Sequence, residues 1–130
     1  MEQINLKLKK DVLAFCFEDS ADLLAIECIV SRFFKNKERE KENTLKVVKI
    51  LLDESVIQAG FVLTNGIFEK WDKSNNEIIH EIKVKWNNLK RELFLGDVVW
   101  FQITKKGRKE FEYLNSLPEL QEDDPFYDDE

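Results

Sequence analysis

The stretch GDVVWFQITKKGR, residues 96–108, decides the fold because it joins a strand directly to a helix. Side chains alternate between the two sides of a strand, and apolar residues occupy both sides of residues 97–103. One face would carry Val99, Phe101 and Ile103, and the other Val98, Trp100 and Gln102. This pattern predicts a final strand that is buried on at least one face.

The same stretch predicts where the last helix begins. Thr104 is a favoured N-cap residue, because its hydroxyl can accept a hydrogen bond from an unpaired amide of the first turn. The helix is expected over residues 105–116, and Pro118 should stop it. Its inward side chains would be Phe111, Leu114 and Leu117. A strand that feeds a helix in this way indicates a domain of the α+β class.

The first part of the chain predicts one strand and one helix. Alternating apolar residues near the N-terminus indicate a strand within residues 1–17, followed by a short element. Apolar residues at helical spacing then indicate a core helix over about residues 20–35, capped by Asp19 or Ser20. Residues 35–43 are charged and contain no apolar residue, so we expect a solvated helix extension or a linker there.

The middle of the chain predicts a helix, a hairpin and another helix. The first helix should start at Thr44 and end before Gly60. Asn-Gly at residues 65–66 separates two β-rich runs and favours a type I′ hairpin turn. Ser74 and Glu77 have the spacing of a capping box, which predicts that a third helix begins there.

Length and charge indicate one domain with an acidic tail. A chain of 130 residues suits a single core, and no apolar run approaches the roughly 20 residues of a membrane helix, so we expect a cytoplasmic protein. The formal net charge is −6, but residues 119–130 hold seven acids and no base. The body, residues 1–118, is therefore nearly neutral. The tail should be loosely attached unless Phe126 and Tyr127 anchor it.

No residue pattern indicates catalysis, a cofactor or a metal. Cys16 and Cys28 lack nearby cysteine or histidine partners and are interpreted as reduced core thiols. His80 is the single histidine, which favours a structural or surface role. The chain has neither a nucleophile elbow nor a glycine-rich phosphate loop, so we expect a protein that is not an enzyme.

The order of predicted elements resembles a winged helix-turn-helix domain. The step Ile103-Thr104-Lys105-Lys106-Gly107-Arg108 is similar to the hydrophobe-Thr-x-x-Gly-Arg step between the wing and the last helix in regulators of the multiple-antibiotic-resistance type. The resemblance covers roughly residues 20–117. It implies an α+β, winged-helix-like single domain, with a helix inserted in the wing region and an acidic C-terminal tail.

The resemblance also implies a way of binding DNA. Residues 44–56 would correspond to the recognition helix. The bases that could meet phosphates on or before this helix are Lys35, Lys37, Arg39, Lys41, Lys46 and Lys49. Between residues 44 and 54, however, no Arg, Asn or Gln is available to read base edges, and the inserted helix and acidic tail also disfavour DNA.

Size, charge and architecture are also similar to those of small acidic immunity proteins, which neutralise a toxin domain by covering its active site. The leading hypothesis is therefore an inhibitor that binds a protein partner, such as a basic toxin domain, by complementary charge. Trp86 and Trp100 are assigned to the core, whereas Trp71 is expected at the interface. The other expected contact residues are Glu69, Asp72, Glu77, Glu81, Asp123, Asp124, Asp128 and Asp129. A scaffolding module is a third hypothesis.

Overall fold

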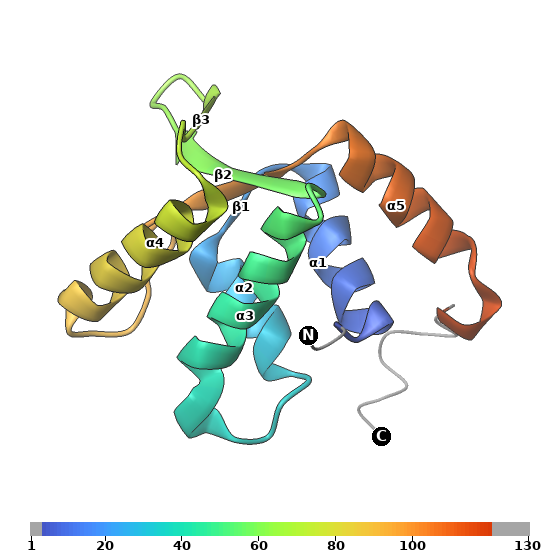
Figure 1. Cartoon of the computed structure of the whole chain (residues 1–130), viewed down its shortest axis with the longest axis horizontal. Coiled ribbons are helices and arrows are strands. Elements are labelled where there is room, and N and C mark those ends of the chain that lie inside the picture. Colours follow the sequence, from blue (N-terminus) through green and yellow to red (C-terminus); the bar gives the residue numbers. More distant parts are fainter. Residues whose placement is uncertain (1–3, 121–130) are drawn as a thin grey trace.

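A computed structural model describes residues 4–120, which form a small α+β domain with five α-helices and a four-stranded antiparallel sheet (Figure 1). No helix of this range is both long enough and apolar enough to cross a membrane. Short 3-10 turns, η1 and η2, occupy Lys37–Arg39 and Pro118–Leu120. The elements are α1 (Leu6–Glu18), β1 (Ala21–Asp22), α2 (Leu23–Ser31), α3 (Glu40–Asp53), β2 (Ile57–Val62), β3 (Phe68–Lys70), α4 (Asn75–Leu89), β4 (Trp100–Ile103) and α5 (Lys105–Ser116).

The final strand, β4, lies inside the sheet, whose strand order is β1-β4-β2-β3. It pairs antiparallel with β1 on one side and with β2 on the other, although β3 and α4 intervene between β2 and β4 in the sequence. The hairpin of β2 and β3 extends beyond these pairings and projects from the body of the domain (Figure 1).

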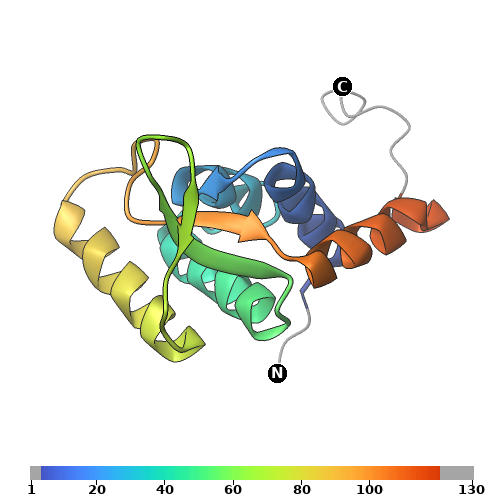
Figure 2. The same ribbon diagram turned by 90° about the horizontal axis from the view of Figure 1, so that it is seen from above.

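The core lies between the sheet and the helices α1, α2 and α3, while α4 and α5 flank the domain on opposite sides (Figures 1 and 2). Phe101, in the middle of β4, has no exposed surface. It belongs to a single cluster that includes Val12, Leu23, Ile26, Val48, Leu51 and Ile82. The prediction that the last strand is buried on one face is confirmed for Val99, Phe101 and Ile103.

Thr104 ties the start of α5 to the turn that follows α3. Its backbone amide donates to the Val56 carbonyl at 3.0 Å, and its hydroxyl donates to the Ser55 carbonyl at 2.6 Å. The same hydroxyl accepts the Gly107 amide at 2.9 Å, which is the predicted N-cap bond. The predicted helix over residues 105–116 is confirmed.

The N-terminal segment is a helix, so the strand predicted within residues 1–17 is wrong. Asn5 caps α1, because its side-chain oxygen accepts the amides of Lys7 and Leu8. The buried apolar side chains follow helical spacing and are Leu8, Val12, Leu13 and Cys16. The strand next to this helix is instead the two-residue β1, which pairs with β4.

The final strand is shorter than predicted, because β4 begins at Trp100. Val98 has a φ of 73°, which lies in the left-handed region that β-branched residues rarely adopt. The Val99 amide donates to the Asp97 carbonyl at 2.8 Å, so the backbone makes a three-residue turn just before β4. The Gly96 amide stabilises this turn, because it donates at 2.6 Å to the buried Asp22 carboxylate at the start of α2.

Two helix starts differ from their predicted positions. Asp22 caps α2, which begins at Leu23, so the predicted caps Asp19 and Ser20 are wrong. The third helix along the chain, α3, begins at Glu40 rather than at Thr44, and thus includes part of the charged stretch. Acidic side chains in its first turn favour this earlier start, because they complement the helix dipole.

The hairpin predicted around residues 65–66 is present, but its turn is not of type I′. Gly66 has a φ of 86°, whereas Asn65 is not in the positive region. The Gly66 amide donates to the Leu63 carbonyl, and the Leu63 amide donates to the Ile67 carbonyl, both at 2.8 Å. This is the pattern of a three-residue hairpin loop that ends on a left-handed glycine.

Candidate partner-binding surface

The end of the β2–β3 hairpin carries an exposed apolar surface. Its aliphatic and aromatic members, Phe61, Leu63 and Ile67, are 47%, 37% and 59% exposed. Phe61 pairs with Glu69 across the hairpin, and Leu63 lies opposite Ile67. Because side chains two residues apart share a face, these four residues lie on the same side of the hairpin. We call Phe61, Leu63, Ile67 and Glu69 the hairpin tip.

On the other face of this hairpin, Gly60 leaves room for the side chain of a neighbouring residue. A Cβ atom at Gly60 would lie 2.6 Å from the Phe68 ring and 2.3 Å from the Glu69 carbonyl oxygen. The Phe68 ring therefore packs directly on the glycine backbone, on the face opposite the hairpin tip. Phe68 is thus partly buried on its face, whereas the apolar members of the hairpin tip are exposed on theirs.

The sequence pattern did not identify Phe61, Leu63 and Ile67 as surface residues, because apolar residues in a β-rich run are typical of core strands. Whether such a face is buried depends on whether another layer covers it, and local sequence carries no signal for that. A cluster of exposed apolar side chains is a common mark of a protein-binding site.

The predicted contact acids lie next to the hairpin and along α4. Glu69 belongs to the hairpin tip itself. Asp72, Glu77 and Glu81 come together around a shallow hollow of about 690 Å³, which His80 also lines. Trp71, which stands between Glu69 and Asp72 in the sequence, is half-buried against the core. The Lys85 ammonium lies 5.4 Å from its ring centre.

Lysines and a helix cap hold two of these acids. Glu81 forms ion pairs with Lys73 at 2.7 Å and with Lys85 at 2.8 Å, and their hydrogen bonds lower the pKa of the Glu81 carboxyl. Glu77 accepts the Ser74 amide at 3.0 Å in the predicted capping box, which is confirmed. This side of α4 is therefore a mixed-charge surface rather than a uniformly acidic one. Asp123, Asp124, Asp128 and Asp129 lie outside the described residues.

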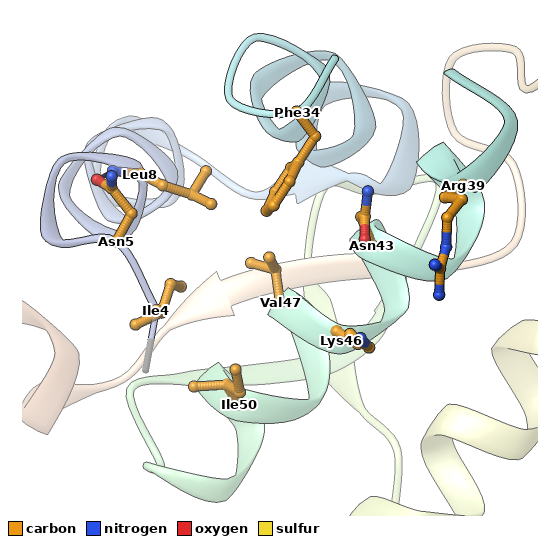
Figure 3. Close-up of a pocket in the computed structure, with 9 residues that line it drawn as sticks. All are labelled: Ile4, Asn5, Leu8, Phe34, Arg39, Asn43, Lys46, Val47 and Ile50. Carbon is orange, nitrogen blue, oxygen red and sulfur yellow. Dashed lines mark hydrogen bonds between the residues drawn. The ribbon is translucent and has the colours of Figure 1, made fainter. Parts of the chain in front are cut away.

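The basic residues that were predicted to contact DNA lie in three separate parts of the structure. Lys41, Lys46 and Lys49 border a groove of about 1140 Å³ between α3 and α4, together with Lys83. Its apolar floor consists of Leu45, Ile50 and Ile79. Arg39 and Lys46 also border a pocket of about 450 Å³ on the other side of α3 (Figure 3). Lys35 and Lys37 lie outside both hollows, in the connection before α3.

Several of these bases already have acidic partners. Arg39 pairs with Glu42 at 2.8 Å, and Lys49 pairs with Asp53 one turn along α3. Lys37 lies 3.8 Å from Glu40. A base that is paired in this way contributes less positive potential to a phosphate-binding surface. The local excess of bases in the sequence therefore overstates the positive charge of this face.

Helix α4 lies beside α3. Lys41 donates to the Asn87 side chain at 2.9 Å, and its ammonium lies 5.2 Å from the ring centre of Trp86. At the other end of α3, Asn75 donates to Asp53 at 3.1 Å. Both ends of α3 are thus tied to α4, which restricts how far this helix could enter a DNA groove.

The residues considered for metal or thiol chemistry are not gathered into a site. Within residues 4–120, no group of three or more His, Cys, Asp and Glu side chains could hold a metal ion. Cys16 is buried, and burial raises the pKa of its thiol to about 12, which disfavours the reactive thiolate. Cys28 is exposed, so its assignment to the core was wrong.

Glu27 on α2 is a half-buried carboxyl with an unusual titration. Its pKa is raised to about 7, first by burial, then by the hydrogen bond and charge of Glu40 on α3 and by the charge of Glu92. Lys41 acts in the opposite direction. Paired carboxyls can serve as an acid and a base, but neither Glu27 nor Glu40 lines any of the three hollows described above.

Glu27 is expected to make the protein more stable in mild acid. Its pKa is 4.5 in an unfolded chain and about 7 in the folded one, so the folded state binds the proton more tightly. This contribution to the free energy of unfolding is complete below about pH 4.5 and is lost as the pH rises towards 7. Glu27→Gln, which resembles the protonated form, should raise the melting temperature by about 4 °C near pH 8 and change little near pH 5.

The matched control is Glu38→Gln, which removes an exposed carboxylate from η1. It should leave the pH dependence of the melting temperature as it is. A Glu27→Gln variant that melts lower than the parent chain near pH 8 would contradict the raised pKa.

Comparisons with known proteins add no relative on which a function could be based. No protein-family model matches the chain, and no significant match was found among curated proteins or solved structures. The function must therefore be inferred from the surfaces described above.

Proposed function

We propose that this chain is a non-enzymatic protein-binding module of winged-helix architecture that neutralises a basic protein partner, as an inhibitor or immunity-like protein. The observation that carries the proposal is the hairpin tip, where three apolar side chains are exposed on one face beside Glu69. Clustered apolar anchors of this kind supply most of the binding energy in protein interfaces.

The arrangement of the elements supports the winged-helix part of the proposal. Helices α2 and α3 are followed by β2, and β2 pairs antiparallel with β4, which leads through Thr104 into α5. This is the order on which the sequence resemblance rests. β3 and α4 then form the predicted insertion between the two strands of the wing.

The chemistry of the hairpin favours a protein over DNA. A wing that follows a nucleic-acid backbone needs cations to offset the phosphate charge. The hairpin tip instead presents Phe61, Leu63 and Ile67 with a single acid, Glu69. Apolar side chains gain by leaving water at a protein surface, whereas Glu69 would be repelled by phosphates.

Charge indicates the class of partner. The chain has a formal net charge of −6, so a basic partner would be attracted over a distance and associate faster. On this proposal the acids predicted from sequence, including those of the tail, steer the partner, and the hairpin tip anchors it. Nucleic-acid-cleaving toxin domains are basic proteins of the kind that such an inhibitor would cover.

Ile67→Asp is expected to weaken partner binding at least tenfold, because it places a charge in the middle of the apolar hairpin tip. A tenfold loss corresponds to about 1.4 kcal/mol, within the range of one interface anchor. The partner to test is any basic C-terminal domain that a neighbouring reading frame encodes, and the measurement is titration calorimetry with the purified proteins.

Tyr113→Asp serves as the control, because Tyr113 is equally exposed but lies on α5, on the opposite flank of the domain from α4 (Figure 2). It should bind the partner as the parent chain does. Equal losses for both variants would exclude the hairpin tip as the specific anchor. The lack of a basic partner domain in the neighbouring frame would count against an immunity role.

A DNA-binding regulator is the second candidate, favoured by the groove in which Lys41, Lys46, Lys49 and Lys83 gather. On the leading proposal, nonspecific duplex DNA should not bind at about 50 mM salt, with or without residues 119–130. Micromolar binding that falls steeply with salt, improves when the tail is removed, and is lost in Lys46→Ala/Lys49→Ala would favour the regulator instead.

A further inference from the structure

The pocket between α1 and α3 has an apolar interior and a basic edge (Figure 3). The ring of Phe34, which is 39% exposed, points into the space above Val47, and Leu8 reaches in from α1 (Figure 3). Ile4 and Ile50 complete the apolar lining, and Arg39 and Lys46 lie at the side. The nine lining residues include two bases and no acid, and one of these bases, Arg39, also pairs with Glu42 outside the lining. Such a pocket suits an aromatic group flanked by carboxylates.

The chain itself contains a segment of this chemistry. In the sequence EDDPFYDDE, residues 122–130, two neighbouring aromatic residues stand between acids on both sides. We propose that this C-terminal segment docks in the chain's own α1–α3 pocket, with Phe126 or Tyr127 in the apolar interior and the adjoining aspartates next to Arg39 and Lys46.

The point where the described chain ends favours this occupant. The Leu120 carbonyl accepts a hydrogen bond from the Lys10 ammonium at 2.8 Å, so the last described residue is attached to α1, the helix that forms one wall of the pocket. Lys10 and Leu8 point to different sides of α1, because residues two apart on a helix do not face the same way. The segment must therefore pass around this helix to reach the pocket.

The remaining chain is long enough to do so. Half the circumference of a helix with its side chains is about 17 Å. The six residue steps from Leu120 to Phe126 span up to about 20 Å when extended. Residues 121–125 would therefore be used as an almost extended strap, which leaves the aromatic pair at the pocket and residues 128–130 beyond it.

Because the segment is covalently attached, even weak binding is sufficient to keep the pocket occupied. A short tether gives an effective concentration on the order of millimolar. A separate peptide with a dissociation constant of about 0.5 mM would therefore correspond to a segment that is docked for much of the time in the intact chain. Complementary charge between the aspartates and the basic edge should make the contact weaker at high salt.

The inference is tested on the full-length chain by NMR spectroscopy. Phe126→Ser/Tyr127→Ser should shift the signals of Leu8, Val47 and Ile50, because the pocket is emptied. Adding a peptide of residues 119–130 to this variant should move the same signals back in a saturable way, with a dissociation constant on the order of 0.1–1 mM. The same peptide with both aromatic residues replaced by serine should bind at least tenfold more weakly.

Phe34→Ser gives the complementary test from the side of the pocket, and Phe15→Ser is its matched control. Both phenylalanines are exposed, at 39% and 50%, but Phe15 does not line the pocket. In the Phe126→Ser/Tyr127→Ser background, Phe34→Ser should weaken peptide binding at least fivefold, whereas Phe15→Ser should not change it. Neither measurement needs a partner protein or DNA, so the result is independent of the proposed function.

Three results would overturn the inference. The first is a peptide that shifts signals of the α3–α4 groove or the hairpin tip in place of those of the pocket. The second is an intact chain whose pocket signals are unchanged by Phe126→Ser/Tyr127→Ser but move when residues 1–3 are deleted, since the N-terminus would then be the occupant. The third is pocket occupancy that falls on dilution, which would show that a second copy supplies the segment.

Discussion

Gly107→Ala is expected to destabilise the protein by about 3 kcal/mol or more, a large fraction of the free energy of unfolding of a typical domain. A Cβ atom at this position would lie 2.0 Å from the Val56 carbonyl oxygen and 2.8 Å from the Ile103 side chain. The backbone at Val56 has little freedom to move away, because its carbonyl accepts the Thr104 amide and its own amide donates to Leu51. Either α5 or the start of β2 must therefore shift.

The expected effect of Gly107→Ala on stability is opposite in sign to the effect of helix propensity. Gly107 lies inside α5, and alanine in an ordinary helix interior is about 1 kcal/mol more favourable than glycine. Urea unfolding should show the opposite order, with the alanine variant less stable. Lys106→Ala, at the exposed neighbouring position, should stay within about 0.5 kcal/mol of the parent chain. A Gly107→Ala protein as stable as the parent would contradict the close packing of α5 on β2.

This glycine also shows what the opening stretch could and could not predict. The N-cap role of Thr104 depends on neighbouring residues and was therefore predictable from residues 96–108. The requirement for glycine at 107 depends on the carbonyl of Val56, far away in the sequence, and local patterns do not contain it. The same holds for the bond from the Thr104 hydroxyl to Ser55.

The sequence predicted where helix α4 begins, but it did not predict the charge of the surface around this helix. Its capping box is a local pattern and is confirmed, as is the assignment of Trp86 to the core. The pair of Glu81 with Lys85 is an i,i+4 pair on α4, whereas the pair with Lys73 depends on how the turn before α4 folds back towards the helix. Charge counted along the chain therefore predicted a more acidic surface than the folded protein presents.

The first helix was missed for a physical reason. Ile4, Leu6 and Leu8 alternate as in a strand, and Leu6 is 45% exposed, so the alternation does not reflect burial. The buried face also includes the charged residues Lys9 and Lys10, which an apolar pattern cannot reveal. The partners of these lysines are close in space but distant in the sequence: Lys9 pairs with Glu54 and Glu110, and Lys10 donates to the Leu120 carbonyl.

Lys9→Ala is therefore expected to cost about 2–3 kcal/mol of stability. The Lys9 side chain is 8% exposed, and its ammonium lies 2.7 Å from Glu54 after α3 and 2.9 Å from Glu110 on α5. Burial alone would lower the pKa of Lys9, but the hydrogen bonds and charges of the two glutamates outweigh it and raise that pKa. Removing one partner of a buried ion pair costs about 3–5 kcal/mol. The expected cost is lower because the Glu54 and Glu110 side chains are partly exposed, but it stays substantial because the Glu54 oxygen that meets Lys9 is itself buried.

Thermal and urea unfolding of two further variants would show that the loss of stability comes from Glu54 and Glu110, which are left without their cation in Lys9→Ala. Lys9→Met/Glu54→Gln/Glu110→Gln keeps the apolar stem and removes all three charges, so it should recover most of the stability lost in Lys9→Ala. Lys7→Ala removes a more exposed lysine, paired with Asp11 on the same helix, and should cost about 0.5 kcal/mol or less. If Lys9→Ala cost no more than Lys7→Ala, the ion pairs of Lys9 would not be what fastens α1 to α3 and α5.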